Sequence, residues 1–192
     1  MHAAAHATRT AARDATNRVA AAHGFTLIEA AVVVAIIGIV ATAAVPSLGA
    51  MLQARRLDGA ATQLAADLQF ARSEAVLRHQ AMRWTLHTGP AGTCYVLHTG
   101  PADACPCDID TPARCEGDAQ AFKTVMLPAA ERIALQSNAA SLLFDPLHGT
   151  SSPGATLRVI GADARVVHQV VNVMGRVRSC SPNAAVSGYR AC

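Results

Sequence analysis

The chain has 192 residues, of which 52% are hydrophobic and 15% are charged, and its formal net charge is +3. This length holds one ordinary domain with an appended segment and does not require two folding units. The net charge is too small to predict a polyanionic partner by itself, but the charge is unevenly distributed. Residues 103–118 contain five acidic residues against one arginine, whereas residues 155–192 contain five arginines against one aspartate.

The most apolar segment covers residues 25–45, where Glu29 is the only charged residue. At about 1.5 Å per residue, such a helix can cross a hydrocarbon core of about 30 Å. Arg9, Arg13 and Arg18 precede it and favour a cytoplasmic N-terminal flank under the positive-inside rule. All six cysteines follow it, so the rest of the chain is expected beyond the membrane, in an oxidising compartment.

An ordinary secretory signal is an alternative interpretation of the same segment. Residues 32–40 would form its apolar region, and Ala41-Thr42-Ala43 would be an A-x-A cleavage site. Glu29 argues against this interpretation, because a carboxylate near the start of the apolar run is costly and has no role in a peptide destined for removal. The charge instead indicates a helix that is retained.

The segment around this carboxylate has the sequence His23-Gly24-Phe25-Thr26-Leu27-Ile28-Glu29. It resembles the processing site of type IV pilins and type II secretion pseudopilins. The resemblance implies that a prepilin peptidase cuts after Gly24, removes residues 1–24 as a leader and leaves a methylated N-terminus at Phe25. It also implies a single-pass protein of the bacterial inner membrane, with a periplasmic head, that later joins a pilus or pseudopilus. Glu29 would then pair with the Phe25 ammonium group of a neighbouring subunit, since an unpaired buried carboxylate is unfavourable.

The apolar periodicity continues through residues 46–82, which predicts a second half of the same helix. Pro46 and Gly49 interrupt the pattern, because proline removes a helical hydrogen bond and crowds the preceding turn. A kink or local melting is therefore expected between Gly38 and Gly49. The residues that carry the periodicity are Leu48, Leu52, Ala61, Leu64, Leu68, Ala71, Ala75 and Val76.

From residue 83 to residue 192 the period changes to two, which predicts a β-rich head. One long helix followed by several strands predicts the α+β class. Residues 143–150 (LFDPLHGT) and 173–178 (VMGRVR) resemble minor pilins of the FimT/GspH type. That resemblance implies the type IV pilin fold, in which the long N-terminal helix packs on an antiparallel, sandwich-like head. Strands are expected at residues 83–87, 94–98, 122–127, 132–136, 141–144, 156–160 and 164–173.

Four cysteines, Cys94, Cys105, Cys107 and Cys115, lie in or beside the acidic stretch. With the neighbouring aspartates they could suggest a zinc or calcium site, but their spacing fits neither kind. Disulfides are favoured instead. Pairing within C-x-C would be strained, so Cys105 and Cys107 are expected to take separate partners, and the connectivity stays open. We expect no metal and no cofactor. The sequence contains no motif that would activate a catalytic nucleophile, so we do not expect an enzyme.

The C-terminal arginines are the main candidates for binding. Arg176 and Arg178 are two residues apart, so on an extended segment both side chains leave the same face and can grip successive phosphates. Closing Cys180 to Cys192 would fix the tail and keep Arg190 nearby. The arrangement resembles the GRxR motif and C-terminal cysteine pair of DNA-binding FimT-like minor pilins, which implies that Arg176 and Arg178 contact DNA. Arg190 is added from charge and proximity. Alternatively, arginines on an edge strand only block edge pairing and keep the head soluble.

Two functions are compatible with these features. The first is a minor type IV pilin that binds double-stranded DNA through its phosphates, without sequence preference, for uptake in natural transformation. The second is a minor pseudopilin of type II secretion, or a subunit that primes pilus assembly, with no contact to nucleic acid. Both imply prepilin peptidase, the inner membrane and other pilin subunits as partners. The arginine cluster favours the first, because a purely structural subunit has no need for a rigidly held cationic loop.

Overall fold

The computed structural model describes residues 24–192, and for residues 43–47 it describes the backbone alone. The predicted leader, except for Gly24, lies outside the described residues. The chain divides into two compact units, Met1–Ala44 and Val45–Cys192.

One long helix, α1, covers Leu27–Arg78. At its start the Thr26 hydroxyl accepts a hydrogen bond from the Glu29 backbone N–H (3.2 Å), which caps the first turn. The helix continues through Pro46 and Gly49, so the local melting expected there is wrong: a proline removes one hydrogen bond, and the remaining ladder persists on both sides. Over the described residues, no helix combines the length and apolarity that a membrane crossing needs. The span expected at residues 25–45 is therefore not confirmed and stays a prediction.

In the unit Val45–Cys192, α1 buries one stripe of apolar side chains. A spacing of three and four residues keeps these side chains on a single helix face, which packs against the strands. Leu48, Leu52 and Val76, which also belong to the periodic pattern, are exposed. The buried stripe consists of Leu57, Ala61, Leu64, Leu68, Ala71 and Ala75.

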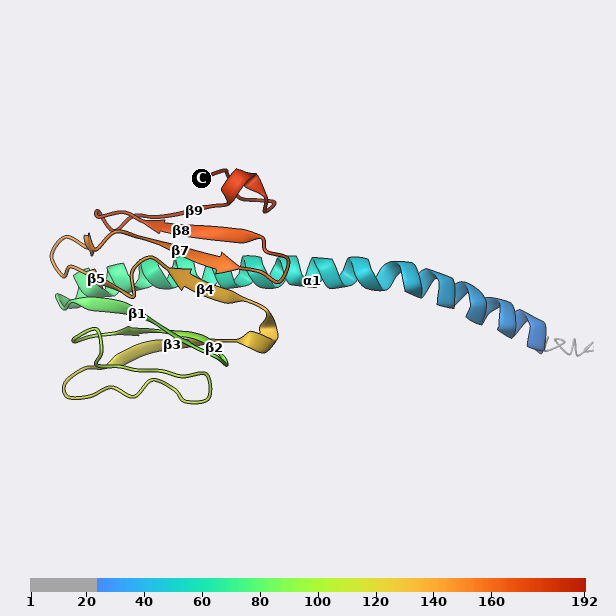
Figure 1. Ribbon diagram of the computed structural model, residues 1–192, viewed down its shortest axis with the longest axis horizontal. Coiled ribbons are helices and arrows are strands. Elements are labelled where there is room, and N and C mark those ends of the chain that lie inside the picture. The colour runs from blue at the N-terminus through green and yellow to red at the C-terminus, as the bar shows by residue number, and fades with distance from the viewer. Residues whose placement is uncertain (1–23) are drawn as a thin grey trace, which may run out of the picture. The chain divides into compact units, whose positions relative to one another are not determined.

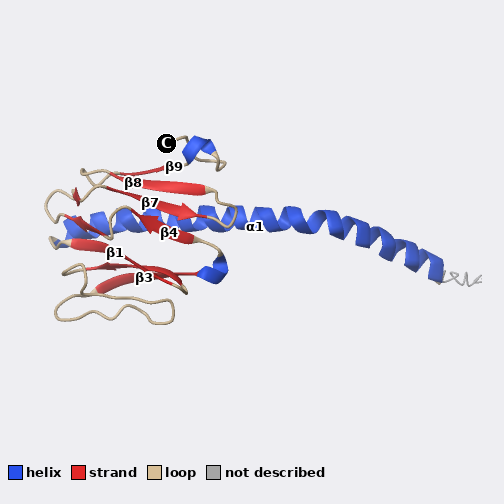
Figure 2. Ribbon diagram, in the orientation of Figure 1, coloured by secondary structure: helices blue, strands red, loops and turns tan. Residues whose placement is uncertain are grey.

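Two antiparallel sheets pack along this part of α1 (Figures 1 and 2). The five-stranded sheet has the order β3-β2-β1-β5-β6, and the four-stranded sheet has the order β4-β7-β8-β9. The first contains β1 (Met82–Gly89), β2 (Gly92–His98), β3 (Ala121–Pro128), β5 (Ser141–Phe144) and β6 (Ser151–Ser152). The second contains β4 (Ala134–Ser137), β7 (Ala155–Ile160), β8 (Val166–Val171) and β9 (Val177–Cys180). Two short 3-10 helices, η1 (Ala129–Glu131) and η2 (Pro182–Ala184), follow β3 and β9.

The helix packed on two sheets confirms the predicted α+β class and pilin-like arrangement. Strand β5 has the predicted bounds, but two predicted strands begin too early. Arg132 and Ala164 have φ values of +56° and +59°, a left-handed conformation that closes a turn, so β4 begins at Ala134 and β8 at Val166. The strands β6 and β9 were not among the expected strands, although Arg176 and Arg178 were expected on an extended segment.

Buried polar contacts tie α1 to both sheets. Asp67 of α1 accepts hydrogen bonds from the Tyr95 hydroxyl (2.7 Å) and the Lys123 ammonium group (2.6 Å) of the five-stranded sheet. Burial raises the pKa of Tyr95, which keeps the hydroxyl protonated as a donor. On the other sheet, Gln169 donates from its side-chain amide to the Ala61 carbonyl of α1 (2.9 Å). The Gln169 contact fixes which residues of β8 face the helix and which face outward.

Candidate nucleic-acid interface

The outer face of the four-stranded sheet carries arginines. Antiparallel pairing places Arg158 of β7 opposite His168 of β8, and His168 opposite Cys180 of β9. Arg178 of β9 lies opposite Val170. Because the residues on either side of Arg158 and His168 are buried, strand alternation turns these two side chains away from the core. The sequences of the four strands contain no aspartate or glutamate, so the charge of this face is positive.

Arg176 lies directly before β9 and is exposed, as is Arg178. Between them, Val177 packs against the core. The two arginines therefore flank an inward-facing residue. In an extended segment, residues at alternate positions point to the same side, so both arginines point away from the core. Strand β9 is the last in its sheet, so both arginines lie at a sheet edge.

A tight turn over residues 172–175 joins β8 to β9 and sets the position of Arg176. The Gly175 N–H donates to the Asn172 carbonyl (2.8 Å), and the Arg176 N–H donates to the Asn172 side-chain oxygen (2.9 Å). Gly175 has a φ of +72°, which glycine adopts without the steric cost that a Cβ brings.

The turn packs tightly against the loop of residues 145–150. A Cβ added to Gly175 would collide with the Gly149 carbonyl oxygen and lie 3.0 Å from Arg72 Nε. Arg72 of α1 donates from Nε to that same carbonyl (2.9 Å). The two stretches that resemble minor pilins in sequence thus meet in space, and their contact positions Arg176.

The loop of residues 145–150 is held by its own first side chain. Asp145 Oδ1 accepts hydrogen bonds from the backbone N–H groups of His148 and Leu147, each at 2.9 Å. These hydrogen bonds favour the charged carboxylate and therefore lower the pKa of Asp145. The bond from the His148 N–H has the largest effect, followed by the bond from the Leu147 N–H. The carboxylate is thus committed to its own loop and not to the neighbouring arginines.

The C-terminal tail is bound to the edge of the same sheet. A disulfide joins Cys180 at the end of β9 to Cys192, the last residue. The Ser181 N–H donates to the Arg190 carbonyl (2.9 Å). The Tyr189 hydroxyl donates to a carboxylate of α1 (2.8 Å), which anchors the tail a second time. Arg190 is therefore held beside the end of β9, with its side chain exposed.

The arginines of this region are not neutralised within the head. In residues 24–192, the salt bridges join Glu74 to Arg78, Asp67 to Lys123, Asp145 to His148 and Asp163 to Arg165. We define the arginine face as the four exposed arginines Arg158, Arg176, Arg178 and Arg190. None of these salt bridges involves the arginine face.

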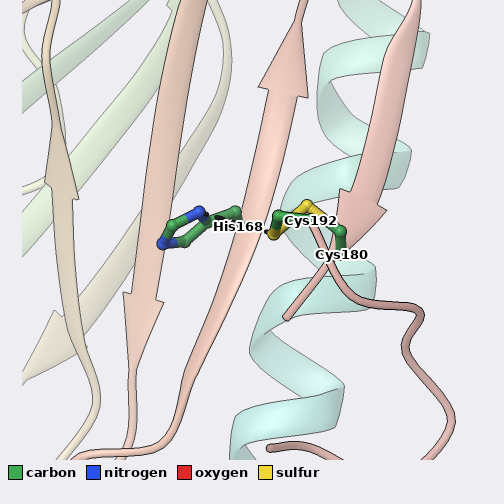
Figure 3. Close-up of side chains that lie close together, drawn as sticks. All are labelled: His168, Cys180 and Cys192. Atoms are coloured by element: carbon green, nitrogen blue, oxygen red, sulfur yellow. Dashed lines mark hydrogen bonds between the residues drawn. A yellow bond between two sulfur atoms is a disulfide. The ribbon is translucent and has the colours of Figure 1, made fainter. Parts of the chain in front are cut away.

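A histidine lies next to the C-terminal disulfide (Figure 3). His168 Nδ1 is 3.7 Å from Cys192 Sγ, and with Cys180 the three residues have the spacing of metal ligands. The two sulfur atoms are bonded to each other, however, so neither is a thiolate. Burial, and then the positive charge of Arg158, lower the pKa of His168, so its ring is neutral near pH 7. The cluster therefore adds rigidity to the arginine face and no charge.

The acidic stretch forms the loop between β2 and β3, on the side of the head away from β9 (Figure 1). Two disulfides, Cys94–Cys107 and Cys105–Cys115, cross-link it. The cysteines of the C-x-C stretch thus take separate partners, and the connectivity that the sequence left open is specified. The head carries opposite charges on opposite sides.

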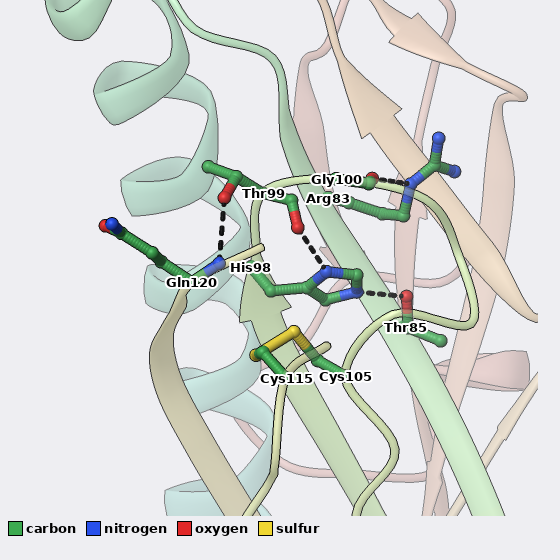
Figure 4. The surroundings of a disulfide bond; sticks show 8 residues. All are labelled: Arg83, Thr85, His98, Thr99, Gly100, Cys105, Cys115 and Gln120. Carbon is green, nitrogen blue, oxygen red and sulfur yellow. Dashed lines mark hydrogen bonds between the residues drawn. A yellow bond between two sulfur atoms is a disulfide. The ribbon is translucent and has the colours of Figure 1, made fainter. Parts of the chain in front are cut away.

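The second of these disulfides lies beside a buried histidine, His98 (Figure 4). His98 Nε2 is 2.8 Å from the Thr85 hydroxyl, and Nδ1 is 2.9 Å from the Thr99 carbonyl oxygen. Burial lowers the pKa of His98, so the neutral ring completes a hydrogen-bonded network within the sheet. This histidine is structural and lies outside the arginine face.

The predicted processing residues lie at the start of the described chain. Gly24 and Phe25 precede α1, and Glu29 lies in its first turn. Phe25 is 86% exposed, and the Glu29 carboxylate makes no salt bridge within residues 24–192. Cleavage after Gly24 and pairing of Glu29 with a neighbouring subunit stay predictions.

The contacts of three residues in this region were not expected from the sequence. Arg158 was counted among the five arginines of residues 155–192, and its apolar neighbours could have placed it on an outer face, but not on the same face as Arg178. Gly149 was noted only within residues 143–150, the stretch that resembles minor pilins, and Arg72 was not identified as a contact of that stretch. Their contact with Gly175 depends on long-range packing that no local sequence pattern records.

Two family comparisons match the chain. The family described as Type II transport protein GspH matches residues 60–175, and the Prokaryotic N-terminal methylation motif matches residues 20–45. The first covers more than half of the chain and ends directly before Arg176. The second contains Gly24, Phe25 and Glu29 and implies processing by a prepilin peptidase. No curated protein matches the sequence.

Solved structures of similar fold come from two bacteria. The type IV minor pilin FimU of Pseudomonas aeruginosa is 20% identical over 67% of this chain and 93% of its own, with a TM-score of 0.47. The minor pseudopilin EpsH of the Vibrio cholerae type 2 secretion system is 14% identical over 65% of this chain and 96% of its own, with a TM-score of 0.45. The GspH family implies assembly with other pilin subunits. The match over residues 60–175 shows that the chain belongs to the GspH family, which is described as a type II transport protein.

Proposed function

We propose that this subunit binds double-stranded DNA through the phosphate backbone and takes part in DNA uptake during natural transformation. The arginine face carries the proposal: its four guanidinium groups are exposed, and within residues 24–192 none has a salt-bridge partner. Like charges gathered without neutralising acids repel one another, and a polyanion relieves that repulsion.

The dimensions of the arginine face suit a phosphate backbone. Arg158 and Arg178 lie on strands β7 and β9 and are offset by two residues in register, so their backbones are about 12 Å apart at a strand spacing of about 4.8 Å and a rise of about 3.4 Å per residue. A DNA duplex carries one phosphate per about 1.7 Å of its axis, so a face of this width meets several phosphates. Each guanidinium group can bind a phosphate through two parallel hydrogen bonds.

The backbone that carries these arginines is already fixed in the free protein. The turn at residues 172–175 sets the position of Arg176, and the Cys180–Cys192 disulfide holds Arg190 beside β9. Binding therefore orders side chains alone, which lowers the entropic cost of association.

The acidic loop on the other side of the head supports the same assignment. Its negative charge repels a polyanion, so DNA approaches the head with the arginine face forward. Contacts to phosphates carry no sequence information, so binding is independent of sequence and weakens as salt rises. A filament subunit with these properties suits the capture of DNA of any origin.

A second candidate is a minor pseudopilin, or a subunit that primes pilus assembly, without any contact to nucleic acid. The family match favours it, because the matching family is a type II transport protein and the match ends before Arg176. The arginines would then serve only to keep edge strand β9 from pairing with other strands.

Fluorescence anisotropy of a short labelled duplex, with the full chain in nonionic detergent, separates the two candidates. The variant R176Q/R178Q is expected to bind about tenfold more weakly or worse, since each hydrogen bond to a charged group is worth about 1.5 to 3 kcal/mol. The matched control R55Q/R56Q removes two neighbouring exposed arginines of α1 and should bind as the wild type does. Wild-type affinity in R176Q/R178Q would contradict DNA binding through this face and leave the second candidate.

A further inference from the structure

The turn between β8 and β9 can be followed in Figure 1. It exposes two apolar side chains that precede Arg176 in the chain. Val173 and Met174 are each 63% exposed. Leu147, from the neighbouring loop, is 70% exposed and lines the same hollow as Gly175 and Arg176. Exposed apolar groups that gather within a polar rim mark a surface that contacts a partner.

The backbone beneath these side chains is held firmly. The Val173 carbonyl accepts a hydrogen bond from the Ser151 N–H (3.0 Å), which ties the turn to β6. The Asn172 N–H also donates to the Arg176 carbonyl (3.1 Å), so the hairpin is closed on both sides of the apolar pair. Val173 and Met174 therefore project from a fixed turn.

The hollow beside the turn has the charge that a nucleic acid requires. It lies between α1, the loop of residues 145–150 and the start of β9. Arg72 and Arg176 contribute to its lining. Among the residues that the structure describes, no aspartate or glutamate lines this hollow. A negatively charged partner with apolar surface between its charges fits this combination, and DNA presents base faces between rows of phosphates.

We propose that Val173 and Met174 contact the bases of the bound duplex and partly unstack one base step, while Arg176 and Arg178 hold the flanking phosphates. This inference rests on the proposed function and adds a preference for easily deformed DNA. Apolar side chains that insert between base steps are a known way for proteins to bend a duplex, and methionine is among the residues used. A mismatched or flexible step yields at lower cost than a rigid one, so such a site discriminates by deformability.

The test uses the full chain in nonionic detergent and two duplexes that differ by one central mismatch, each with 2-aminopurine beside it. The wild type should bind the mismatched duplex about tenfold more tightly and raise the 2-aminopurine fluorescence, because unstacking that step costs less. V173S/M174S should bind both duplexes equally, without the fluorescence change, and should keep the wild-type salt dependence because no phosphate contact is lost. M174L keeps an apolar side chain and should behave as the wild type.

A matched control comes from α1, where Met51 and Leu52 are adjacent and are 56% and 59% exposed. They lie about 36 Å along the helix from Val76, which lines the hollow. M51S/L52S should keep the mismatch preference. Thermal unfolding of each variant verifies that the fold is retained, as expected for exposed side chains.

Three outcomes overturn the inference: no mismatch preference in the wild type, an unchanged preference in V173S/M174S, or loss of pilin-subunit binding by that variant with DNA binding intact. The last would make the turn a protein-docking surface. If R176Q/R178Q loses DNA binding and V173S/M174S behaves as the wild type, the base contact is refuted and the proposed function stands. Wild-type binding by R176Q/R178Q removes the proposed function itself.

Discussion

The substitution Gly175→Ala tests the packing that positions Arg176. The alanine would have to adopt a φ of +72°, at a cost of about 1 to 2 kcal/mol. Its Cβ would also meet the Gly149 carbonyl oxygen and two atoms of Arg72, at 3.0 and 3.1 Å, and overpacking of this kind costs about 1 to 3 kcal/mol. The free energy of unfolding should therefore fall by about 2 to 5 kcal/mol, a large share of the stability of an ordinary domain.

Urea unfolding with the disulfides intact measures this loss, and two other glycines separate its causes. Gly117 has a φ of +61° and open space where a Cβ would lie, so Gly117→Ala carries the backbone cost alone, about 1 to 2 kcal/mol. Gly59 lies in α1 with open space, and Gly59→Ala should stabilise the chain by up to about 1 kcal/mol. If Gly175→Ala lost no more stability than Gly117→Ala, the contact with Gly149 and Arg72 would not hold the turn.

Three further predictions concern pH, the tail and processing. Burial lowers the pKa of His87, His98 and His168 below the ordinary value of 6.5, so the unfolded chain binds more protons in mild acid. The free energy of unfolding should be full above about pH 6.5 and fall as the pH drops below it, which urea titrations at about pH 7.5 and 5.5 can measure; equal stability would contradict the burial argument. C180S/C192S should lose about 3 kcal/mol of stability in urea and bind DNA more weakly, because Arg190 is no longer held; unchanged DNA affinity would exclude Arg190 from the interface. Gly24→Leu should block cleavage, whereas Glu29→Ala should permit cleavage and impair incorporation into filaments, as N-terminal sequencing and filament fractionation would show. A mature N-terminus near Ala44 would instead indicate ordinary signal cleavage.

Local patterns in the sequence predict much of this fold, because the spacing of apolar residues determines which side of each element can be buried. The spacing of Ala61, Leu64 and Leu68 predicts a helix with one buried face, and that face is the one that packs on the sheets. Strand starts are less predictable. Arg132 and Ala164 adopt a left-handed conformation that neither residue type favours, so these two residues do not signal where the turns close and the strands begin.

The candidate site depends more on long-range packing than the fold does. Arg176 and Arg178 are visible in the sequence as an alternating pair. Arg158 joins them through the register of β7, β8 and β9, and the fit of Gly175 against Gly149 follows from the packing of two loops on α1. Neither relation can be derived from spacing along the chain, because both join residues that are close only after folding.

The salt dependence of DNA binding is the most direct measurement of whether Arg176 and Arg178 contact phosphates. Each phosphate contact contributes about −0.9 to the slope of log affinity against log salt. For a duplex titrated with the full chain, we expect a steep negative slope that becomes shallower by about 2 in R176Q/R178Q, with weaker binding at every salt concentration. R55Q/R56Q should keep the wild-type slope. Equal slopes and equal affinities for the wild type and R176Q/R178Q would show that these arginines do not contact phosphates.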